Sequence, residues 1–580
     1  MTTADTASFL SIVVPVYQPD PAHFEAAVAS VLAQTDPDWE LVLVADGPQP
    51  EQVLDIARCG DPRVRLVQRA ENGGIVAATN DGLAAASGTF VGFLDNDDTL
   101  APNAVAAFHE AIRRWDDVDA LYSDEDKLNP AGDRCDHFPK PSWSPERLLC
   151  QMYLNHFTAY RRSLVEEVGG LRQDYHGSQD FDLALRVTER ARRVVHVPQI
   201  LYHWRQAPDS TALDPSAKTW AFEAGVRAVG DALARREIPA VANMHPTWPG
   251  VVCVDPVLTE FPLVSIVMLT GGTRRVVRGT EVTLVENSVR SVLEHTTYPN
   301  FELVVVFDRN SSDALIEQIE TLGGGRVRAV RDTRAFNYSA ANNLGATATA
   351  GEYLVFLNDD TEVITPDWLQ RLVLFSLPDE VGAVGAALEF ADGRIQHAGV
   401  SARCGGPAHP YLGYLGTDPG EVAALALTRN TLAVTGACLC VSAADFDAVG
   451  GFTTTLPLNF NDVDFCLKLI RMGRRNVVDM RTRLVHLEHS SRPRHVDGWE
   501  HLAILRRWLP LLHADPWDNP NFTTENGEQL PPPLHLTQLR EQAGELDFPA
   551  RSWPLEPLGT DASTDQYVVG RFAEVGLLST

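Results

Sequence analysis

Positive charge is scarce in this sequence. Its 580 residues include 48 Lys and Arg against 77 Asp and Glu, which gives a formal net charge of −29. Proteins that bind nucleic acid need clustered basic side chains for the phosphates, so we expect no nucleic-acid partner. A small nucleotide is still compatible with an acidic chain, because a bridging metal ion neutralises its phosphates within a local pocket.

Paired cysteines and long apolar runs are also missing. The eight cysteines contain no C-x-x-C pair, and the nearest two, Cys438 and Cys440, would point to opposite faces of a strand. This favours buried, reduced thiols and a cytoplasmic protein. No uncharged apolar stretch of about 20 residues is present. The opening MTTADTASF has no basic region and no long apolar region, so it predicts no signal peptide.

The chain contains an internal repeat. Each half reads as a strand, a helix, two further strands and an Asn-bearing segment. These are residues 9–17, 24–34, 39–47, 64–68 and 72–88 in the first half, and 261–270, 285–295, 301–311, 327–332 and 336–351 in the second. Alternating strands and helices, with apolar runs such as LVLV, indicate a parallel sheet buried on both faces. The predicted fold class is therefore α/β, with a mostly parallel sheet in each half.

A Pro-rich stretch at 236–250 lies between the two halves, and the strand–helix pattern decays after about residue 520. We therefore predict three parts: a domain at 1–250, a second at 251–520, and a C-terminal extension at 521–580.

An acidic phrase follows a buried strand in each half, FLDNDDT at 93–99 and FLNDDT at 356–361. Asp95, Asp97 and Asp98 crowd into four residues, and carboxylates this close repel one another unless a cation neutralises them. A divalent ion with open positions for phosphate oxygens is the natural partner. Capping of the next helix explains Asp98 alone equally well, but a cap needs only one carboxylate.

An Asp-x-Asp pair opens a helical pattern later in each half, Asp180 and Asp182 in the first, Asp462 and Asp464 in the second. Such a carboxylate suits a general base that acts on a hydroxyl. The alternative is helix capping and compensation of the helix dipole. Recurrence of the pair in both halves favours the catalytic interpretation.

A histidine follows each pair at a matched distance. His203 lies 23 positions after Asp180, and His486 lies 24 positions after Asp462. A lone histidine on a strand is usually structural, but matched spacing in two repeats favours a metal ligand. His489 lies three residues from His486, and spacing alone favours His486.

Asp46 and Asp308 end the second strand of each half. In open α/β sheets the ligand lies beyond the carboxyl ends of the strands. A carboxylate there accepts a hydrogen bond from the imide N–H of uracil or thymine, or it caps the following loop. The sequence does not separate these two roles.

Taken in order, these motifs resemble family 2 glycosyltransferases of the GT-A fold, in the tandem arrangement of bacterial polysaccharide and O-antigen biosynthesis proteins. The resemblance rests on SIVVPVY, VADG, NGGIVAATNDGL, FLDNDDTL, YSDEDK, KPSWSPERLL, GSQDFDLALR and YHWR, and then on FELVVVFDRNS, FNYSAANNLGA, FLNDDTEV and FNDVDFCLKL. It covers roughly residues 9–520. It implies two tandem GT-A domains that transfer hexosyl or deoxyhexosyl groups.

The resemblance also implies a role for each candidate residue. Asp180 and Asp462 would be the catalytic bases, Asp97, His203, Asp360 and His486 would hold Mn²⁺ or Mg²⁺, and Pro15, Tyr17, Asp46, Asp95, Asp308 and Asn358 would line the donor sites. The implied donor is a UDP- or dTDP-sugar. The implied acceptor is a polymeric or lipid-linked glycan, the latter met at the inner face of the cytoplasmic membrane.

The second half departs from the pattern at two places. Asn358 stands where the first half has Asp95, and the segment 268–282 lacks Pro-x-Tyr and carries extra residues. Two interpretations follow: a bifunctional transferase, or one active domain fused to a degenerate, glycan-binding domain. A dinucleotide-binding or scaffolding protein is disfavoured, because the strand–helix turns lack G-x-G-x-x-G.

Overall fold

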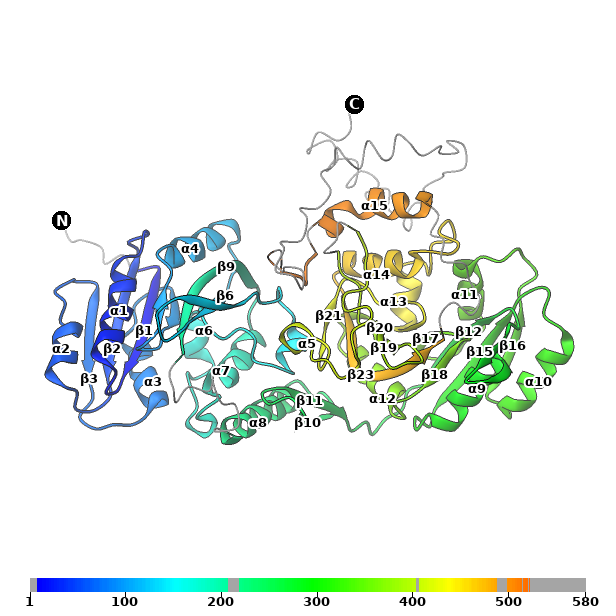
Figure 1. Cartoon of the computed structure of the whole chain (residues 1–580), viewed down its shortest axis with the longest axis horizontal. Coiled ribbons are helices and arrows are strands. Elements are labelled where there is room, and N and C mark those ends of the chain that lie inside the picture. The colour runs from blue at the N-terminus through cyan, green and yellow to red at the C-terminus, as the bar shows by residue number, and fades with distance from the viewer. Residues whose placement is uncertain are drawn as a thin grey trace, which may run out of the picture. The chain divides into compact units, whose positions relative to one another are not determined.

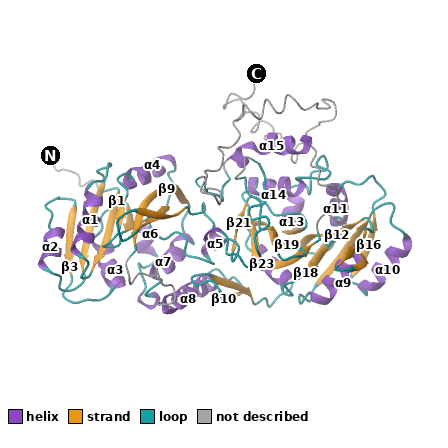
Figure 2. Ribbon diagram, viewed as in Figure 1, coloured by secondary structure: helices purple, strands orange, loops and turns teal. Residues whose placement is uncertain are grey.

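The computed structural model describes residues 8–206, 219–402, 406–487, 498–513, 515–519 and 521. The described part of the chain divides into two compact units (Figures 1 and 2), the first built from described residues within 8–237, 241–254 and 519–521, the second from described residues within 238–240 and 255–518. The predicted boundary stretch contains strand β10 (Ala240–Met244), which pairs with β11 (Val252–Pro256) in a small two-stranded sheet.

The first unit contains one large sheet with helices packed on it. Its elements are β1 (Leu10–Val16), α1 (Pro21–Leu32), β2 (Trp39–Ala45), α2 (Glu51–Ala57), β3 (Val64–Gln68), α3 (Ile75–Ala85), β4 (Phe90–Phe93), β5 (Thr99–Leu100), α4 (Ala104–Arg114), β6 (Ala120–Leu128), β7 (Arg134–Phe138), α5 (Pro145–Leu148), β8 (Thr158–Arg161), α6 (Arg162–Glu167), η1 (Gln173–Tyr175), α7 (Gln179–Thr188), β9 (Val194–Arg205) and α8 (Thr219–Arg235).

The sheet order is β3-β2-β1-β4-β8-β6-β9-β5, with β7 paired to β6. The strands β3, β2, β1 and β4 are parallel, whereas β8 runs antiparallel to both β4 and β6. The apolar runs of β1 and β2 are almost entirely buried. The predicted strands at 9–17, 39–47 and 64–68 are confirmed as β1, β2 and β3. Their carboxyl ends share one edge of the sheet, and the acidic phrase follows β4 there.

The second unit repeats this architecture. Its elements are β12 (Val264–Thr270), β13 (Arg274–Val277), β14 (Thr280–Thr283), α9 (Leu284–His295), β15 (Phe301–Phe307), α10 (Asp313–Gly323), β16 (Val327–Arg331), α11 (Tyr338–Ala346), β17 (Tyr353–Asn358), β18 (Thr361–Val363), α12 (Trp368–Ser376), β19 (Val381–Glu389), β20 (Ile395–His397), η3 (Glu421–Ala423), β21 (Thr428–Thr431), β22 (Cys438–Ser442), α13 (Ala443–Ala448), α14 (Asn461–Arg471), β23 (Arg475–His486) and α15 (Gly498–His513).

The order β16-β15-β12-β17-β22-β19-β23-β18 matches the first sheet strand for strand. The predicted repeat and the α/β class are therefore confirmed, although the sheets are mixed beyond their parallel halves. The extra residues predicted at 268–282 form the antiparallel hairpin of β13 and β14. Strand β21, paired to β23, is a further addition of this unit.

The Asn-bearing segments have a structural role that both units share. In the first, Asn80 of α3 accepts from the backbone N–H of Leu171 and donates to its carbonyl, each at 2.9 Å. In the second unit, Asn343 of α11 makes the same two hydrogen bonds with the backbone N–H and carbonyl of Phe452, each at 2.8 Å. Each amide thus fixes the turn that leads toward the helix carrying the Asp-x-Asp pair.

Within the described residues, no helix combines the length and the apolar composition needed to cross a membrane. The predicted extension lies outside the described residues, apart from Asn521, and so do His489 and Cys404.

Candidate functional site

The three carboxylates of the first acidic phrase occupy different environments. Asp98 is buried and accepts from the Tyr202 hydroxyl at 2.5 Å and from the backbone N–H of Arg205 at 2.6 Å. Desolvation, with repulsion from Asp95 and Asp97, raises the pKa of Asp98 to about 8. Asp98 therefore packs into the sheet edge, whereas Asp95 and Asp97 are partly exposed beside it.

Asp95 and Asp180 lie within electrostatic reach of each other, although 85 positions separate them in the chain. The Asp95 side chain is 47% exposed, yet the surrounding protein desolvates it and raises its pKa, with repulsion from Asp97 and Asp180 adding to the shift. Asp180, at the first turn of α7, is exposed to solvent, and protein packed around it raises its pKa as well. The fold thus brings the predicted base beside the acidic phrase.

His203 lies on β9 directly opposite Thr99 of β5, which sets it beside the acidic phrase. Its Nδ1 lies 2.6 Å from Asp126 Oδ1. A histidine held by a carboxylate through one ring nitrogen presents the other, Nε2, to a ligand, an arrangement common around metal sites.

The predicted donor-site residues of the first unit lie at the carboxyl ends of β1 and β2. Pro15 accepts from the Asn96 side chain at 3.0 Å, and Tyr17 is 48% exposed. Asp46 is buried and accepts from the backbone N–H groups of Gly73 and Gly74 at 2.8 and 2.9 Å. Asp46 therefore holds the loop between β3 and α3, not the loop that directly follows β2. The prediction that it reads a base is not tested by these contacts.

The second unit brings its predicted metal ligands into direct contact. Asp360 Oδ1 lies 3.1 Å from His486 Nε2. The other ring nitrogen of His486, Nδ1, lies 2.6 Å from Gln396 Oε1. Asn358 Nδ2 lies 3.3 Å from Nε2, so the amide of the acidic phrase also contacts this ring.

Asp462 is the first-turn aspartate of α14. Its Oδ2 accepts from the backbone N–H of Gly436 at 2.9 Å, and its Oδ1 accepts from that of Val463 at 2.8 Å. Tyr338 donates to the Gly436 carbonyl at 2.9 Å and lies 3.3 Å from Asn358 Oδ1. The predicted base of the second half is thus linked through Gly436 and Tyr338 to the acidic phrase.

Asp308 lines a pocket at the carboxyl ends of β12 and β15. The pocket is bounded by Leu269, Thr270, Val306, Phe307, Asp308, Asp332, Arg334, Phe336 and Ala341. Arg334 is paired with Asp332 through Nε and Oδ1 at 2.8 Å, and the Phe336 ring is 55% exposed. An exposed aromatic ring and a carboxylate in one hollow provide stacking and hydrogen bonding for a planar base.

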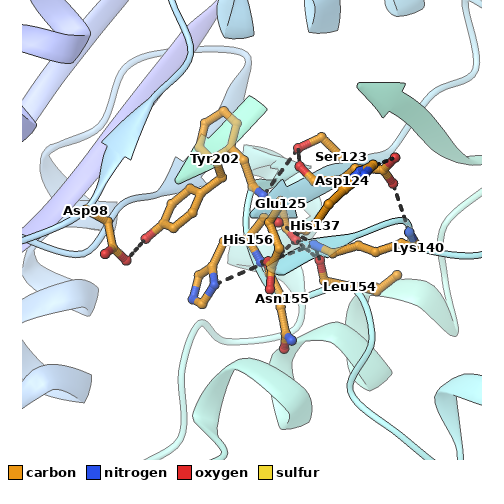
Figure 3. A network of polar contacts seen from close by, with 12 residues as sticks. Asp98, Ser123, Asp124, Glu125, His137, Lys140, Leu154, Asn155, His156 and Tyr202 are labelled. Atoms are coloured by element: carbon orange, nitrogen blue, oxygen red, sulfur yellow. Dashed lines mark hydrogen bonds and ion pairs between the residues drawn. The ribbon is translucent and has the colours of Figure 1, made fainter. Parts of the chain in front are cut away.

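Sequence reasoning missed a polar network in the first unit. Glu125 and Lys140 are buried, and His156 is partly buried beside them (Figure 3). The carboxylate of Glu125 lies 3.0 Å from Lys140 Nζ and 3.5 Å from His156 Nδ1. The phrase YSDEDK contains Glu125, but the sequence gives no spacing that links it to Lys140 and His156.

The residues present fit a divalent ion in the second unit. Two ligands at right angles around an ion with bonds of about 2.1 Å are about 3 Å apart, and Asp360 Oδ1 and His486 Nε2 are 3.1 Å apart. Within the described residues, no group of three or more His, Cys, Asp or Glu side chains is arranged to hold a metal. Mg²⁺ sites that use one or two protein ligands and complete their shell with substrate phosphates need no such group.

Two stretches of the chain, residues 11–169 and 280–402, match the family model described as glycosyl transferase family 2. The chain belongs to glycosyltransferase family 2. The first stretch contains the acidic phrase at 93–99 and the second the phrase at 356–361.

Several known proteins are similar to this family member. The "Uncharacterized protein y4gI" of Sinorhizobium fredii is 39% identical over 90% of this chain and 58% of its own length. The "O-antigen biosynthesis protein RfbC" of Myxococcus xanthus is 35% identical over 90% of this chain and 42% of its own. The chain thus spans about half the length of these two relatives. A crystal structure of S. aureus TarS 1-349 in complex with UDP covers 39% of this chain and 65% of its own, at 18% identity and a TM-score of 0.32.

Proposed function

We propose that the chain is a bifunctional, metal-dependent, inverting glycosyltransferase that uses nucleotide-diphosphate sugars and extends a cell-surface polysaccharide or lipid-linked glycan. Each predicted domain, 1–250 and 251–520, would carry one active site. The observation that carries the proposal is the repeated placement of an acidic phrase, a histidine strand and a first-turn aspartate at the same edge of two equivalent sheets.

The residues suggest a division of labour. Asp308 and its pocket would bind the base of a UDP- or dTDP-sugar in the second half, and Asp46, Pro15 and Tyr17 would do so in the first. Asp97 with His203, and Asp360 with His486, would hold Mn²⁺ or Mg²⁺ against the diphosphate. When bound, such an ion neutralises the charge that develops on the leaving diphosphate.

Proton transfer falls to Asp180 and Asp462. The acceptor hydroxyl gives its proton to the carboxylate while its oxygen bonds to the anomeric carbon, and the bond to the diphosphate breaks with its electron pair on the diphosphate. A raised pKa makes Asp180 a stronger base than an ordinary aspartate, because protonation of its carboxylate is easier.

A second candidate is that only the first half transfers sugar and the second half binds glycan. Asn358, with no charge, stands at the position of Asp95 in the matched strands, and a hairpin replaces the Pro-x-Tyr segment; both changes favour a second half that no longer binds a donor.

Release of nucleoside diphosphate from a panel of UDP- and dTDP-sugars tests the proposal. We expect turnover of at least one donor, a fall of about 100-fold or more on chelation with EDTA, and recovery with Mn²⁺. Turnover that EDTA leaves unchanged would refute the metal dependence. No turnover of any donor, with or without oligosaccharide acceptors, would refute the transferase activity.

A further inference from the structure

Four charges of alternating sign run through the first unit from its interior to the acidic phrase. Figure 3 labels Lys140, Glu125 and His156: Lys140 Nζ lies 3.0 Å from Glu125 Oε2, and the same oxygen lies 3.5 Å from His156 Nδ1. His156 Nε2 lies 4.0 Å from Asp95 Oδ2. Lys140 is fully buried, whereas Asp95 is 47% exposed. The row therefore connects a buried cation to a carboxylate at the predicted donor site.

The interior end of the row is rigid. The ammonium of Lys140 donates to Glu125, to the Leu154 carbonyl at 2.7 Å and to the His156 carbonyl, so all three of its protons are used. Glu125 also accepts from the backbone N–H of His156 at 3.1 Å. The carboxylate that faces the His156 ring is thus fixed from two sides.

The His156 ring is fixed as well. It stacks on Tyr202 with ring centroids 4.6 Å apart. Desolvation opposes its charged form, but Glu125, Asp95 and Asp98 outweigh that effect and raise the pKa of His156 to about 9. Asp95 therefore faces a cation at neutral pH, and this cation offsets the repulsion from Asp97 and Asp180.

The second unit shows that the fold does not require this row. In the matched strands Ala437 stands at the position of His156 and Asn358 at that of Asp95. Glu389 pairs with Val485 as Glu125 pairs with Tyr202, but its carboxylate is bound to Arg483 at 2.8 Å. Ala437 is buried, so the sheet packs with an apolar group where the first unit has His156. Buried ion pairs are usually no more stabilising than such apolar replacements. The histidine is thus present in the half that has Asp95 and replaced by alanine in the half that has Asn358.

We propose that His156 is a positioning residue of the first site: held by Glu125 and Lys140, it fixes the Asp95 carboxylate in the orientation that binds the nucleotide part of the donor. The inference rests on the proposed donor site of the first half. It adds to that function a residue to which neither the family match nor the acidic motif assigns a role.

A double-mutant cycle on the full-length chain tests this role. The second donor site is disabled in all proteins by Asp308→Ala, and UDP binding with Mn²⁺ is measured by calorimetry for the background, His156→Gln, Asp95→Asn and both together. We expect His156→Gln to weaken binding roughly tenfold, about 1.4 kcal/mol, and to have little further effect once Asp95 is Asn. His137→Gln is the matched control, because His137 contacts the same network through Asp124 at 3.9 Å, away from Asp95.

Each outcome has a defined meaning. The positioning role would be overturned if His156→Gln left UDP binding unchanged, or if it weakened binding as much in the Asp95→Asn protein as in the background. Either result would leave the proposed donor site unaffected. No UDP binding by the background, when the wild-type chain binds UDP, would overturn the first donor site and the role with it. Should His156→Gln fail to melt cooperatively, His156→Asn replaces it in the cycle.

Discussion

At the scale of the residue, two aspartates of one motif have opposite surroundings. Asp180 is exposed at the mouth of α7, whereas Asp182 is buried and paired with Arg172 Nε at 3.0 Å and Arg186 Nη2 at 2.6 Å. In the second unit Asp464 is equally buried and accepts from Trp508 Nε1 at 2.8 Å. The second aspartate of each pair thus holds the helix in place, and the first is the more exposed of the two.

The buried carboxylate of Glu125 predicts a specific acid sensitivity. Desolvation opposes its charge, but Lys140 and His156 dominate and lower its pKa from 4.5 to about 2. A depressed pKa means that the stabilisation is complete above about pH 4.5 and is lost as the pH falls toward 2, an effect of about 3 kcal/mol. Chemical denaturation should therefore show Glu125→Gln well below wild type at pH 6, with the gap closing between pH 4.5 and 2.

The matched control for this titration is Glu110→Gln, whose side chain is 74% exposed. We expect that variant to follow the wild-type stability at every pH. A gap between wild type and Glu125→Gln that stays constant down to pH 2 would contradict the pairing of Glu125 with Lys140 and His156.

The candidate site residues that could be predicted from the sequence were those recognisable from their immediate neighbours in the chain. Crowded carboxylates after a strand, and an aspartate at a helix start, are visible in a few letters. The partners of these residues were not, because His156 lies 61 positions from Asp95 and Glu125 lies 15 from Lys140, with no repeat in the second half to reveal them. The contact of Asp360 with His486, 126 positions apart, was implied only by the resemblance, which named both as metal ligands.

At the scale of the element, helix α15 supports the loop that precedes α14. Glu500 is buried and accepts from the backbone N–H groups of Leu458 and Asn459 at 3.1 and 3.0 Å, and from the Asn459 side chain at 2.6 Å. Phe460, next in the loop, has a φ of +57°, a left-handed conformation that is costly for a bulky residue. Glu500 thus holds a strained turn two residues before Asp462.

Replacing Glu500 by Gln should weaken this loop. One of its oxygens becomes an amide donor that faces a donor of the loop, either the backbone N–H groups of Leu458 and Asn459 or the Asn459 side-chain amide, which costs about 1–3 kcal/mol in a buried site. We expect a lower unfolding temperature and reduced transfer by the second half, measured by calorimetry and by donor turnover in the Asp180→Asn background. Arg506→Gln, at an exposed position of the same helix, is the control. Equal behaviour of both variants would contradict the supporting role.

The predicted strands and helices of the repeat were confirmed because their signals are periodic and local. Helix α15 was not predicted, since its placement depends on contacts such as Glu500 with Leu458, 42 positions away. The mixed half of each sheet was missed for a similar reason: antiparallel pairing of β8 and β22 joins strands far apart in the sequence.

At the scale of the whole molecule, two equivalent sheets carry two sites with different charge. The first has Asp95 with the Lys140–Glu125–His156 row, and the second has Asn358 with a contact between Asp360 and His486. Two sheets with the same strand order and different charges near the predicted donor sites are the expected outcome if each half uses its own donor. The same difference in charge also fits a second half that has kept its fold but binds glycan without transferring sugar. Measuring the transfer activity of each half distinguishes the two alternatives.

The most direct measurement is the product spectrum of Asp180→Asn and Asp462→Asn, assayed separately in the full-length chain by mass spectrometry with a defined oligosaccharide acceptor and a mixture of sugar nucleotides. Each substitution should abolish one transfer step, by about 100-fold or more, and leave the other half's step intact when its acceptor is supplied. An Asp462→Asn protein that makes every wild-type product at the wild-type rate would contradict two working sites and favour a glycan-binding second half.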